Sequence, residues 1–179
     1  MLKHSSKIFV AIVSALIGYA DIVYAGNPNK CEAVPSISPL TGISGAHLSD
    51  ADLKGKVVVM QFFASWCVGC EKTMSDVSML LQGRKDLVFV PVSVDEDVKS
   101  ARSFFAGKSA TLKSLEAKAF VDMSTKFASQ MDINAIPSIV VSDKNGKIIE
   151  RSSGHPDAAQ LDAFKRAVDK AGAVAEKTH

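Results

Sequence analysis

No excess of charge of either sign marks this chain of 179 residues. Its 21 Lys and Arg residues stand against 19 Asp and Glu residues, a net charge of +2. A surface that binds nucleic acid needs a cluster of basic residues, and a charged interaction tail needs a run of one sign. Neither occurs, and repeats and low-complexity blocks are also absent. The sequence therefore predicts no nucleic-acid partner, and one domain is the natural expectation at this length.

Cysteine is scarce, which limits the metal chemistry open to the chain. The three cysteines are Cys31, Cys67 and Cys70. A structural zinc site needs about four ligands. The histidines that could complete one are scattered, at His4, His47, His155 and His179. The sequence therefore predicts no zinc site. Cys31 is left over as a free thiol on the N-terminal arm, with pairing between chains or contact with the other cysteines as alternatives.

An apolar run long enough to span a membrane is missing too. Near the start, the run from Ile8 to Ala20 has 13 residues, whereas a spanning helix needs about 20. Two lysines precede this run. After it, the segment Val23-Tyr24-Ala25 places small residues at the positions that a signal peptidase reads. This order predicts a signal peptide over residues 1–25 that is cleaved after Ala25 and exports the chain. An uncleaved N-terminus that anchors the protein in a membrane is the alternative.

What the chain does have is two cysteines separated by two residues, in the segment Trp66-Cys67-Val68-Gly69-Cys70. An apolar run over 57–64 predicts a buried strand before it, and helical spacing over 70–81 predicts a helix after it. The unpaired N–H groups at that helix start favour the thiolate of Cys67, the form that attacks disulfides. Cys70 should be more buried and would resolve the mixed disulfide by attacking Cys67. The pattern predicts a redox-active pair, with a static disulfide as the alternative.

The rest of the sequence alternates predicted strands and helices. We expect a strand over 87–94, a helix over 98–105, a loop over 107–113, a helix over 125–131, strands over 138–142 and 147–151, and a last helix from about Pro156. Asn145-Gly146 is a strong hairpin signal between the last two strands. Strands linked by helices pair in parallel and hairpin strands pair antiparallel, so we predict an α/β fold with a mixed central sheet and helices on both faces.

Composition sets the predicted domain boundaries. Residues 26–45 are rich in Pro, Ser and Gly, which predicts a flexible N-terminal arm with little regular structure. Residues 46–173 then form the folded domain. The polar residues 174–179 form a tail that frays.

Three stretches resemble one family. They are LSDADLKGKVVVMQFFASWC, VFVPVSVDED and AIPSIVVSDKNGKIIERSSG, and they are similar to the exported TlpA-like and DsbE-like group of thioredoxin-fold proteins, from about Ala46 to Ala171. The resemblance implies a thioredoxin-like three-layer fold with a TlpA-type insertion. It also implies an exported thiol–disulfide oxidoreductase without a bound cofactor, which reduces disulfides of periplasmic proteins. Its electrons would come from a membrane electron donor of the DsbD or CcdA kind.

The resemblance also assigns roles around the cysteine pair. Trp66 would shield the pair and offer an apolar contact to a protein substrate. Pro137 is expected to be cis, which would place the backbone of Ile136 beside Cys67. An extended substrate could then pair with that backbone as an added strand.

The two residues between the thiols, Val68 and Gly69, are expected to tune the reduction potential. This intervening pair affects how well the thiolate is held. Neither residue adds a positive charge or a side-chain donor, which favours a reductant over a strong oxidant.

Three positions depart from the family pattern. Gln61 stands where thioredoxins carry a buried acid that helps to move protons, Thr73 where many TlpA-like reductases carry Glu, and Ser75 where a helix-kinking Pro is usual. Because Gln61 cannot titrate, no general base for Cys70 is evident. His155 follows the glycine whose loop should border the site, and it is either a group that tunes Cys67 near neutral pH or a surface histidine.

Two other functions compete with the oxidoreductase. Cu(I) prefers thiolate ligands, so Cys67, Cys70 and His155 could form the site of a metallochaperone. The cysteine spacing is shorter than in known carriers, and the methionines are not clustered in a motif. A peroxidase related to peroxiredoxins would need Thr and Arg near a cysteine in a different loop. The exported reductase is therefore the leading hypothesis, with Cu(I) handling as the alternative.

Overall fold

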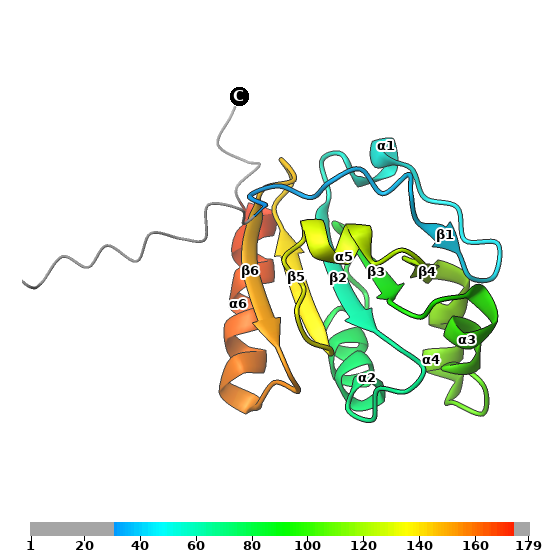
Figure 1. Cartoon of the computed structure of the whole chain (residues 1–179). Helices are drawn as coiled ribbons and strands as arrows, with labels where there is room; N and C mark the ends of the chain where they lie inside the picture. Colours follow the sequence, from blue (N-terminus) through cyan, green and yellow to red (C-terminus); the bar gives the residue numbers. More distant parts are fainter. Residues whose placement is uncertain (1–30, 174–179) are drawn as a thin grey trace, which may run out of the picture. The chain divides into compact units, whose positions relative to one another are not determined.

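Six strands form one mixed sheet, and helices cover both of its faces (Figure 1). The computed structural model describes residues 31–173. The strands are β1 (Thr41–Gly42), β2 (Val57–Phe63), β3 (Leu87–Ser93), β4 (Phe120–Val121), β5 (Ser138–Ser142) and β6 (Ile148–Ser153), in the spatial order β1-β4-β3-β2-β5-β6. The helices are α1 (Asp50–Leu53), α2 (Cys70–Leu80), α3 (Val98–Ser103), α4 (Ala110–Leu115), α5 (Lys126–Gln130) and α6 (Ala158–Ala173). The predicted signal peptide and the predicted tail over 174–179 lie outside the described residues.

Strand β2 runs through the middle of the sheet and leads to the cysteine pair. It pairs in parallel with β3 and antiparallel with β5, and all seven of its residues are buried. A strand that is covered on both faces needs apolar side chains on both, which explains its nearly continuous apolar sequence. The predicted mixed α/β sheet is confirmed.

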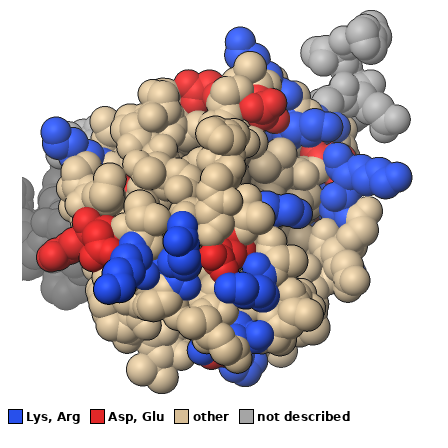
Figure 2. Space-filling model, turned by 90° about the vertical axis from the view of Figure 1, so that its right-hand side faces the viewer, with Lys and Arg blue, Asp and Glu red and all other residues tan. Residues whose placement is uncertain are grey.

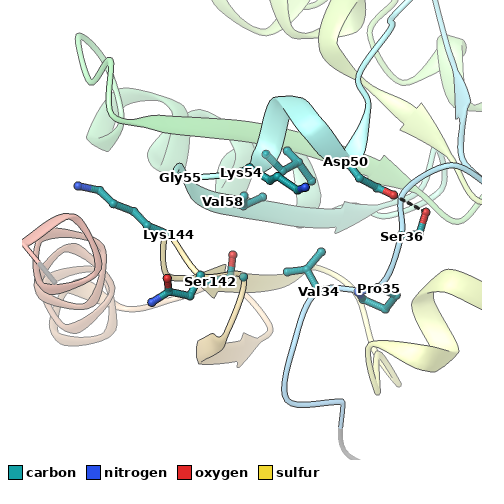
Figure 3. Close-up of a pocket in the computed structure, with 12 residues that line it drawn as sticks. Val34, Pro35, Ser36, Asp50, Lys54, Gly55, Val58, Ser142 and Lys144 are labelled. Carbon is teal, nitrogen blue, oxygen red and sulfur yellow. Dashed lines mark hydrogen bonds between the residues drawn. The ribbon is translucent and has the colours of Figure 1, made fainter. Parts of the chain in front are cut away.

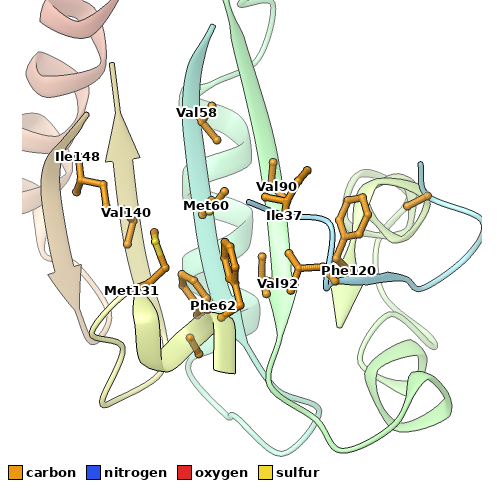
Figure 4. Close-up of a cluster of buried hydrophobic side chains, with 14 residues drawn as sticks. Ile37, Val58, Met60, Phe62, Val90, Val92, Phe120, Met131, Val140 and Ile148 are labelled. Carbon is orange, nitrogen blue, oxygen red and sulfur yellow. The ribbon is translucent and has the colours of Figure 1, made fainter. Parts of the chain in front are cut away.

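Alternate side chains of β2 pack on opposite faces of the sheet, as the pleat of a strand requires. Met60 and Phe62 pack on the face that α5 covers, together with side chains of β3 and β5 (Figure 4). Val57 and Val59 pack on the other face, in a cluster with side chains of α2 and α6. The three layers of the expected thioredoxin-like fold follow from this alternation.

Residues 31–45 are not the flexible arm that their composition predicted. Ile37 and Ile43 are each 1% exposed, and Ile37 lies beside Val90 of β3 in Figure 4. The two-residue strand β1 within this segment pairs with β4 at the edge of the sheet. The prediction failed because the buried isoleucines have no regular spacing in the sequence, while Pro, Ser and Gly surround them. The packed part of the chain therefore begins well before Ala46.

The expected TlpA-type insertion is the segment VFVPVSVDED with the helices α3 and α4 that follow it, and this segment has more structure than the sequence predicted. Helix α4 lies largely where a loop was predicted over 107–113, and the side chain of Ser109 caps it by accepting the N–H of Leu112. Phe104 and Phe105 pack against Phe63 at the end of β2, with ring centroids 4.6 and 5.6 Å away. The insertion therefore braces the strand that carries the cysteine pair.

The outer surface near α3 and α4 mixes charges of both signs. Figure 2 shows basic and acidic side chains interspersed on this side of the molecule. Glu116 forms ion pairs with Lys113 and Arg102 here. The Lys113 contact, the hydroxyl of Ser44 and the Arg102 charge hold the pKa of Glu116 below its ordinary value. These contacts tie the insertion to the segment around β1.

Candidate active site

Cys67 lies in the turn between β2 and α2, Cys70 is the first residue of α2, and a disulfide joins them. The N–H of Cys67 donates to the carbonyl of Ala64 (3.1 Å), and the N–H of Cys70 donates to the carbonyl of Cys67 (3.3 Å). Gly69 is the N-cap of α2, so the helix begins at Cys70. Cys67 therefore lies in the turn that precedes the helix, rather than at the helix start where the sequence placed it.

The two cysteines differ in exposure. Cys70 is fully buried, in a cluster with Phe63 of β2, whereas Cys67 is only partly buried. Trp66 and Val68, the neighbours of Cys67, are 69% and 98% exposed. A protein substrate can therefore approach Cys67 across an apolar surface, while Cys70 is screened from solvent.

Ile136 and Pro137 reach the cysteine pair from the loop before β5. Their peptide bond is cis, as expected. A Cβ added to Gly69 would lie 4.0 Å from Cδ of Pro137, so the proline ring lies beside the turn that holds both cysteines. Ile136 packs against the same buried cluster as Cys67. Residues that are far apart in the sequence thus meet at one place.

A groove opens beside Trp66. It has a volume of about 440 Å³. Its lining is formed by Trp66, Val94, Thr125, Ala128, Ser129, Ile133, Asn134, Ala135 and Ile136. None of these side chains carries a charge, so the groove suits an uncharged segment of a partner better than a charged one.

Gln61 contacts the backbone of the buried cysteine. Its Nε2 donates to the carbonyl oxygen of Cys70 (3.3 Å). Its Oε1 is buried and has no hydrogen-bond partner among the described residues. Because an amide cannot ionise, Gln61 holds the backbone of Cys70 without offering it a proton acceptor that titrates.

His155 contacts helix α2. Its Nδ1 lies 2.9 Å from Oγ1 of Thr73, and its Nε2 lies 3.7 Å from Oδ2 of Asp76. The hydroxyl of Thr73 donates to the carbonyl of Gly69 (3.1 Å), so it accepts the hydrogen on Nδ1. His155 thus fastens the loop after β6 to the first turn of α2.

The Cu(I) alternative gains no support from this arrangement. Across residues 31–173, no three His, Cys, Asp or Glu side chains are grouped so that they could hold a metal ion.

Within the same range, no helix has the length and apolar character needed to cross a membrane.

Asp95 contacts the active-site turn, which sequence reasoning missed. Its carboxylate accepts hydrogen bonds from the N–H of Ser65 (2.9 Å), the hydroxyl of Ser65 (2.7 Å) and the hydroxyl of Ser93 (2.7 Å). Asp95 does not cap the helix that follows it, because Asp97 is the cap of α3. In the sequence, this contact is indicated by a serine just after β2 and an acid just after β3. These two residues come together only when the two strands pair in the sheet.

Another cavity of about 440 Å³ lies at the opposite end of β2 from the cysteine pair (Figure 3). At its edge, Asp50 accepts hydrogen bonds from the hydroxyl of Ser36 (2.7 Å) and the N–H of Ile37 (2.8 Å). These two bonds hold the pKa of Asp50 below its ordinary value. They join the segment 31–45 to α1, so this cavity belongs to the packing of the N-terminal segment.

Comparison with known proteins agrees with this geometry. Residues 45–169 match the thioredoxin-like domain model. The chain belongs to the thioredoxin-like domain family. The thiol-disulfide oxidoreductase ResA of Bacillus cereus is 28% identical over 127 residues, 70% of each chain. ResA of Geobacillus kaustophilus is 24% identical over 80% of this chain and 82% of that one.

Solved structures share the fold of this thioredoxin-like chain. A protein assigned as the thiol:disulfide interchange protein DsbE from Chlorobium tepidum has a TM-score of 0.67 at 21% identity, covering 80% of this chain and 97% of that chain. A secreted Mycobacterium tuberculosis disulfide oxidoreductase, homologous to E. coli DsbE, has a TM-score of 0.59 at 20% identity, covering 76% and 96%. With the family match, the similarity to ResA and the Cys67–Cys70 disulfide, the chain is a thiol–disulfide oxidoreductase with a thioredoxin-like domain.

Proposed function

We propose that this protein is an exported reductase of protein disulfides in the bacterial periplasm. Cys67 is its nucleophile and Cys70 its resolving cysteine. The observation that carries the proposal is the contrast between them: Cys67 is partly exposed between two exposed apolar side chains, while its disulfide partner is fully buried. An incoming disulfide can therefore meet Cys67 first.

The reaction consists of two exchange steps. In the reduced protein, the Cys67 thiolate attacks one sulfur of a substrate disulfide, and the other substrate sulfur leaves as a thiolate that takes up a proton. Cys70 then loses its proton and attacks the sulfur of Cys67. The substrate's second thiol leaves, and the Cys67–Cys70 disulfide forms. Two electrons pass to the substrate, and the disulfide form of the structure is the oxidised product of this cycle.

The surroundings of Cys67 support contact with an extended protein segment. The backbone of Ile136 would pair with such a segment as an added strand, and Trp66 would cover its side chains. The uncharged groove beside Trp66 would accept a neutral or apolar side chain next to the substrate cysteine. These substrate-binding roles of Trp66, Ile136 and Pro137 are part of the proposal.

The direction of electron flow is inferred from what the turn lacks. Val68 and Gly69 offer no charge and no side-chain donor to hold a thiolate, and a strong oxidant needs its reduced form stabilised. The protein must then be recharged by a dithiol, for which we propose a membrane electron donor of the DsbD or CcdA kind. At equilibrium with glutathione, we expect a potential closer to about −270 mV than to about −120 mV.

Export is proposed on the predicted signal peptide over residues 1–25. A secreted disulfide oxidoreductase among the structural neighbours supports it. Cell fractionation with N-terminal sequencing tests it: the periplasmic fraction should contain a chain that begins at Gly26. A chain that retains Met1 in the membrane fraction would favour the anchored alternative, and one that stays in the cytoplasm would refute export.

A trapping experiment tests the catalytic roles. In a Cys31→Ser background, Cys70→Ser removes the resolving thiol, so mixed disulfides with substrate proteins should accumulate on Cys67 in the periplasm. They should disappear on treatment with a reductant. The control variant Cys67→Ser, which retains Cys70, should form none. Absence of adducts from the Cys70→Ser variant, or equal trapping by both variants, would contradict the proposal.

A further inference from the structure

Asp95 is a buried acid whose part in the reaction is not accounted for. Its carboxylate is 4% exposed, and it accepts three hydrogen bonds, two of them from Ser65. No Lys, Arg or His of residues 31–173 forms an ion pair with it. The hydrogen-bond donors to its carboxylate are therefore neutral, and no ion pair within the described residues compensates its charge.

This charge lies close to the nucleophile. The amide nitrogen of Ser65 lies 2.9 Å from a carboxylate oxygen of Asp95. Two steps of about 3.8 Å separate the α carbons of Ser65 and Cys67, so the charge lies within about 12 Å of the Cys67 backbone. A negative charge at this range, screened little by solvent, disfavours a second negative charge on the sulfur. The hydrogen bonds from Ser65 also fix the backbone just before Trp66, because both the amide and the hydroxyl of Ser65 end on one carboxylate.

We propose that Asp95 is a positioning residue that holds the Ser65–Cys67 segment through Ser65 and, by its charge, keeps the reduced Cys67–Cys70 pair from being stabilised as a thiolate. It thereby makes the pair more reducing. This inference rests on the proposed role of Cys67 as nucleophile, and it adds a cause for the direction of electron flow.

The test separates the charge from the tether. Asp95→Asn removes the charge but keeps the shape, one acceptor oxygen for the N–H of Ser65, and an amide that can donate to the serine hydroxyls. Ser65→Ala removes one hydrogen bond but keeps the charge. The matched control is Asp143→Asn, since Asp143 is also buried (8% exposed) and accepts the N–H groups of Asn145 and Lys147 in the turn between β5 and β6. This turn lies at the end of the sheet opposite the cysteine pair.

Two readouts are used that a merely structural role would not move. The first is the pH midpoint for iodoacetamide alkylation of Cys67 in the reduced protein, and the second is the equilibrium constant with glutathione above that midpoint. For Asp95→Asn we expect the midpoint to fall by about one pH unit. We expect the equilibrium to shift about tenfold toward the dithiol protein, which corresponds to a potential about 30 mV less negative. Ser65→Ala and Asp143→Asn should stay near wild type in both.

An unchanged midpoint and equilibrium constant in Asp95→Asn would overturn the inference, and so would an equal shift in Asp143→Asn. If Asp95→Asn does not fold, the double variant Ser93→Ala/Asp95→Asn takes its place, because it removes a hydrogen-bond donor together with the charge. The same shifts in the alkylation midpoint and in the equilibrium constant are expected for it, and unchanged values would again overturn the inference. Failure of the wild-type protein to exchange with glutathione would instead refute the proposed function. The two failures are therefore distinguishable.

Discussion

The imidazole Nδ1 of His155 lies 2.9 Å from the hydroxyl oxygen of Thr73, and this contact joins the loop after β6 to the helix that begins at Cys70. The same hydroxyl donates to the carbonyl of Gly69, between the two cysteines. Thr73 stands where a glutamate is usual in the family that the sequence resembles. Its side chain thus connects the cysteine turn to a distant loop without bringing an ionisable group to Cys70.

Replacement of Thr73 tests this connection. Thr73→Val keeps the shape but removes the hydroxyl, so Nδ1 of His155 loses its partner, while the carbonyl of Gly69 keeps the backbone N–H of residue 73 (3.2 Å). We expect a loss of about 1 kcal/mol in the free energy of unfolding. In a double-mutant cycle with His155→Ala, the coupling energy should be about 0.5–1.5 kcal/mol. Urea denaturation measures both. The control is Thr111→Val, at an exposed threonine of α4. Strictly additive effects of Thr73→Val and His155→Ala would show that the contact contributes nothing to stability.

Gln61 gives a prediction with a defined pH dependence. Gln61→Glu places a carboxyl in a site that is 0% exposed, and burial disfavours the ionised form, so its pKa in the folded state should lie above the ordinary value of about 4.3. The unfolded chain then ionises first as the pH rises. Stability should match that of the wild type near pH 4 and fall by roughly 2–4 kcal/mol by pH 7, at about 1.4 kcal/mol for each unit of the pKa shift.

Urea denaturation at pH 4 and pH 7 measures this difference. The control is Gln61→Met, which carries no charge and should lose the same stability at both values. A loss in Gln61→Glu that does not depend on pH would show that water reaches the new carboxyl.

Features that depend on residues close together in the sequence could be predicted, and contacts between distant segments could not. The strand over 57–63, the helix after it and the cysteine pair between them are local patterns, so the sequence located them. The cis bond at Pro137 came from family resemblance, since nothing in the local residues requires it. The contacts Ser65–Asp95 and Thr73–His155 could not be predicted, because each joins segments that meet only once the sheet and its loops are in place.

The burial of side chains in residues 31–45 could also not be predicted from the sequence. Ile37 and Ile43 lie in a stretch of turn-forming residues, and a hydrophobic pattern needs several regularly spaced members before it indicates a strand or a helix. Their burial depends on the uncovered area beside β3 and β4, which composition does not reveal.

Truncation of one of these side chains tests whether the segment is part of the core. Ile37→Ala should lower the free energy of unfolding by about 2–4 kcal/mol, because Ile37 is 1% exposed and packs in the cluster that holds Met60 and Phe62. Ile149→Ala is the matched control: Ile149 is 37% exposed on β6, and a change within about 0.5 kcal/mol is expected. Equal small losses in both variants would mean that the segment is loosely attached, as its composition first suggested.

The ion pairs of Arg84, in the loop between α2 and β3, predict how stability responds to acid. Arg84 donates from Nε and Nη2 to both oxygens of Asp86 at 2.8 Å, and from Nη1 to Asp169 of α6 at 2.7 Å. The hydrogen bonds from Arg84 lower the pKa of Asp86 to about 2. Because the folded pKa is depressed, the stabilisation is complete above the ordinary value near 4 and is lost as the pH falls toward 2. The side chain of Asp86 is 39% exposed, so solvent screening leaves about 1 kcal/mol.

Asp86→Asn should therefore unfold about 1 kcal/mol more easily than the wild type at pH 7, and the gap should close between about pH 4 and pH 2. Urea denaturation of both proteins at pH 7, 4 and 2.5 measures it. Asp162→Asn, at an exposed acid of the same helix α6, should differ little from the wild type at every pH. A gap between Asp86→Asn and wild type that persists at pH 2.5 would show that the substitution acts through packing against β3. In that case the ion pair that ties the start of β3 to α6 would not be the cause.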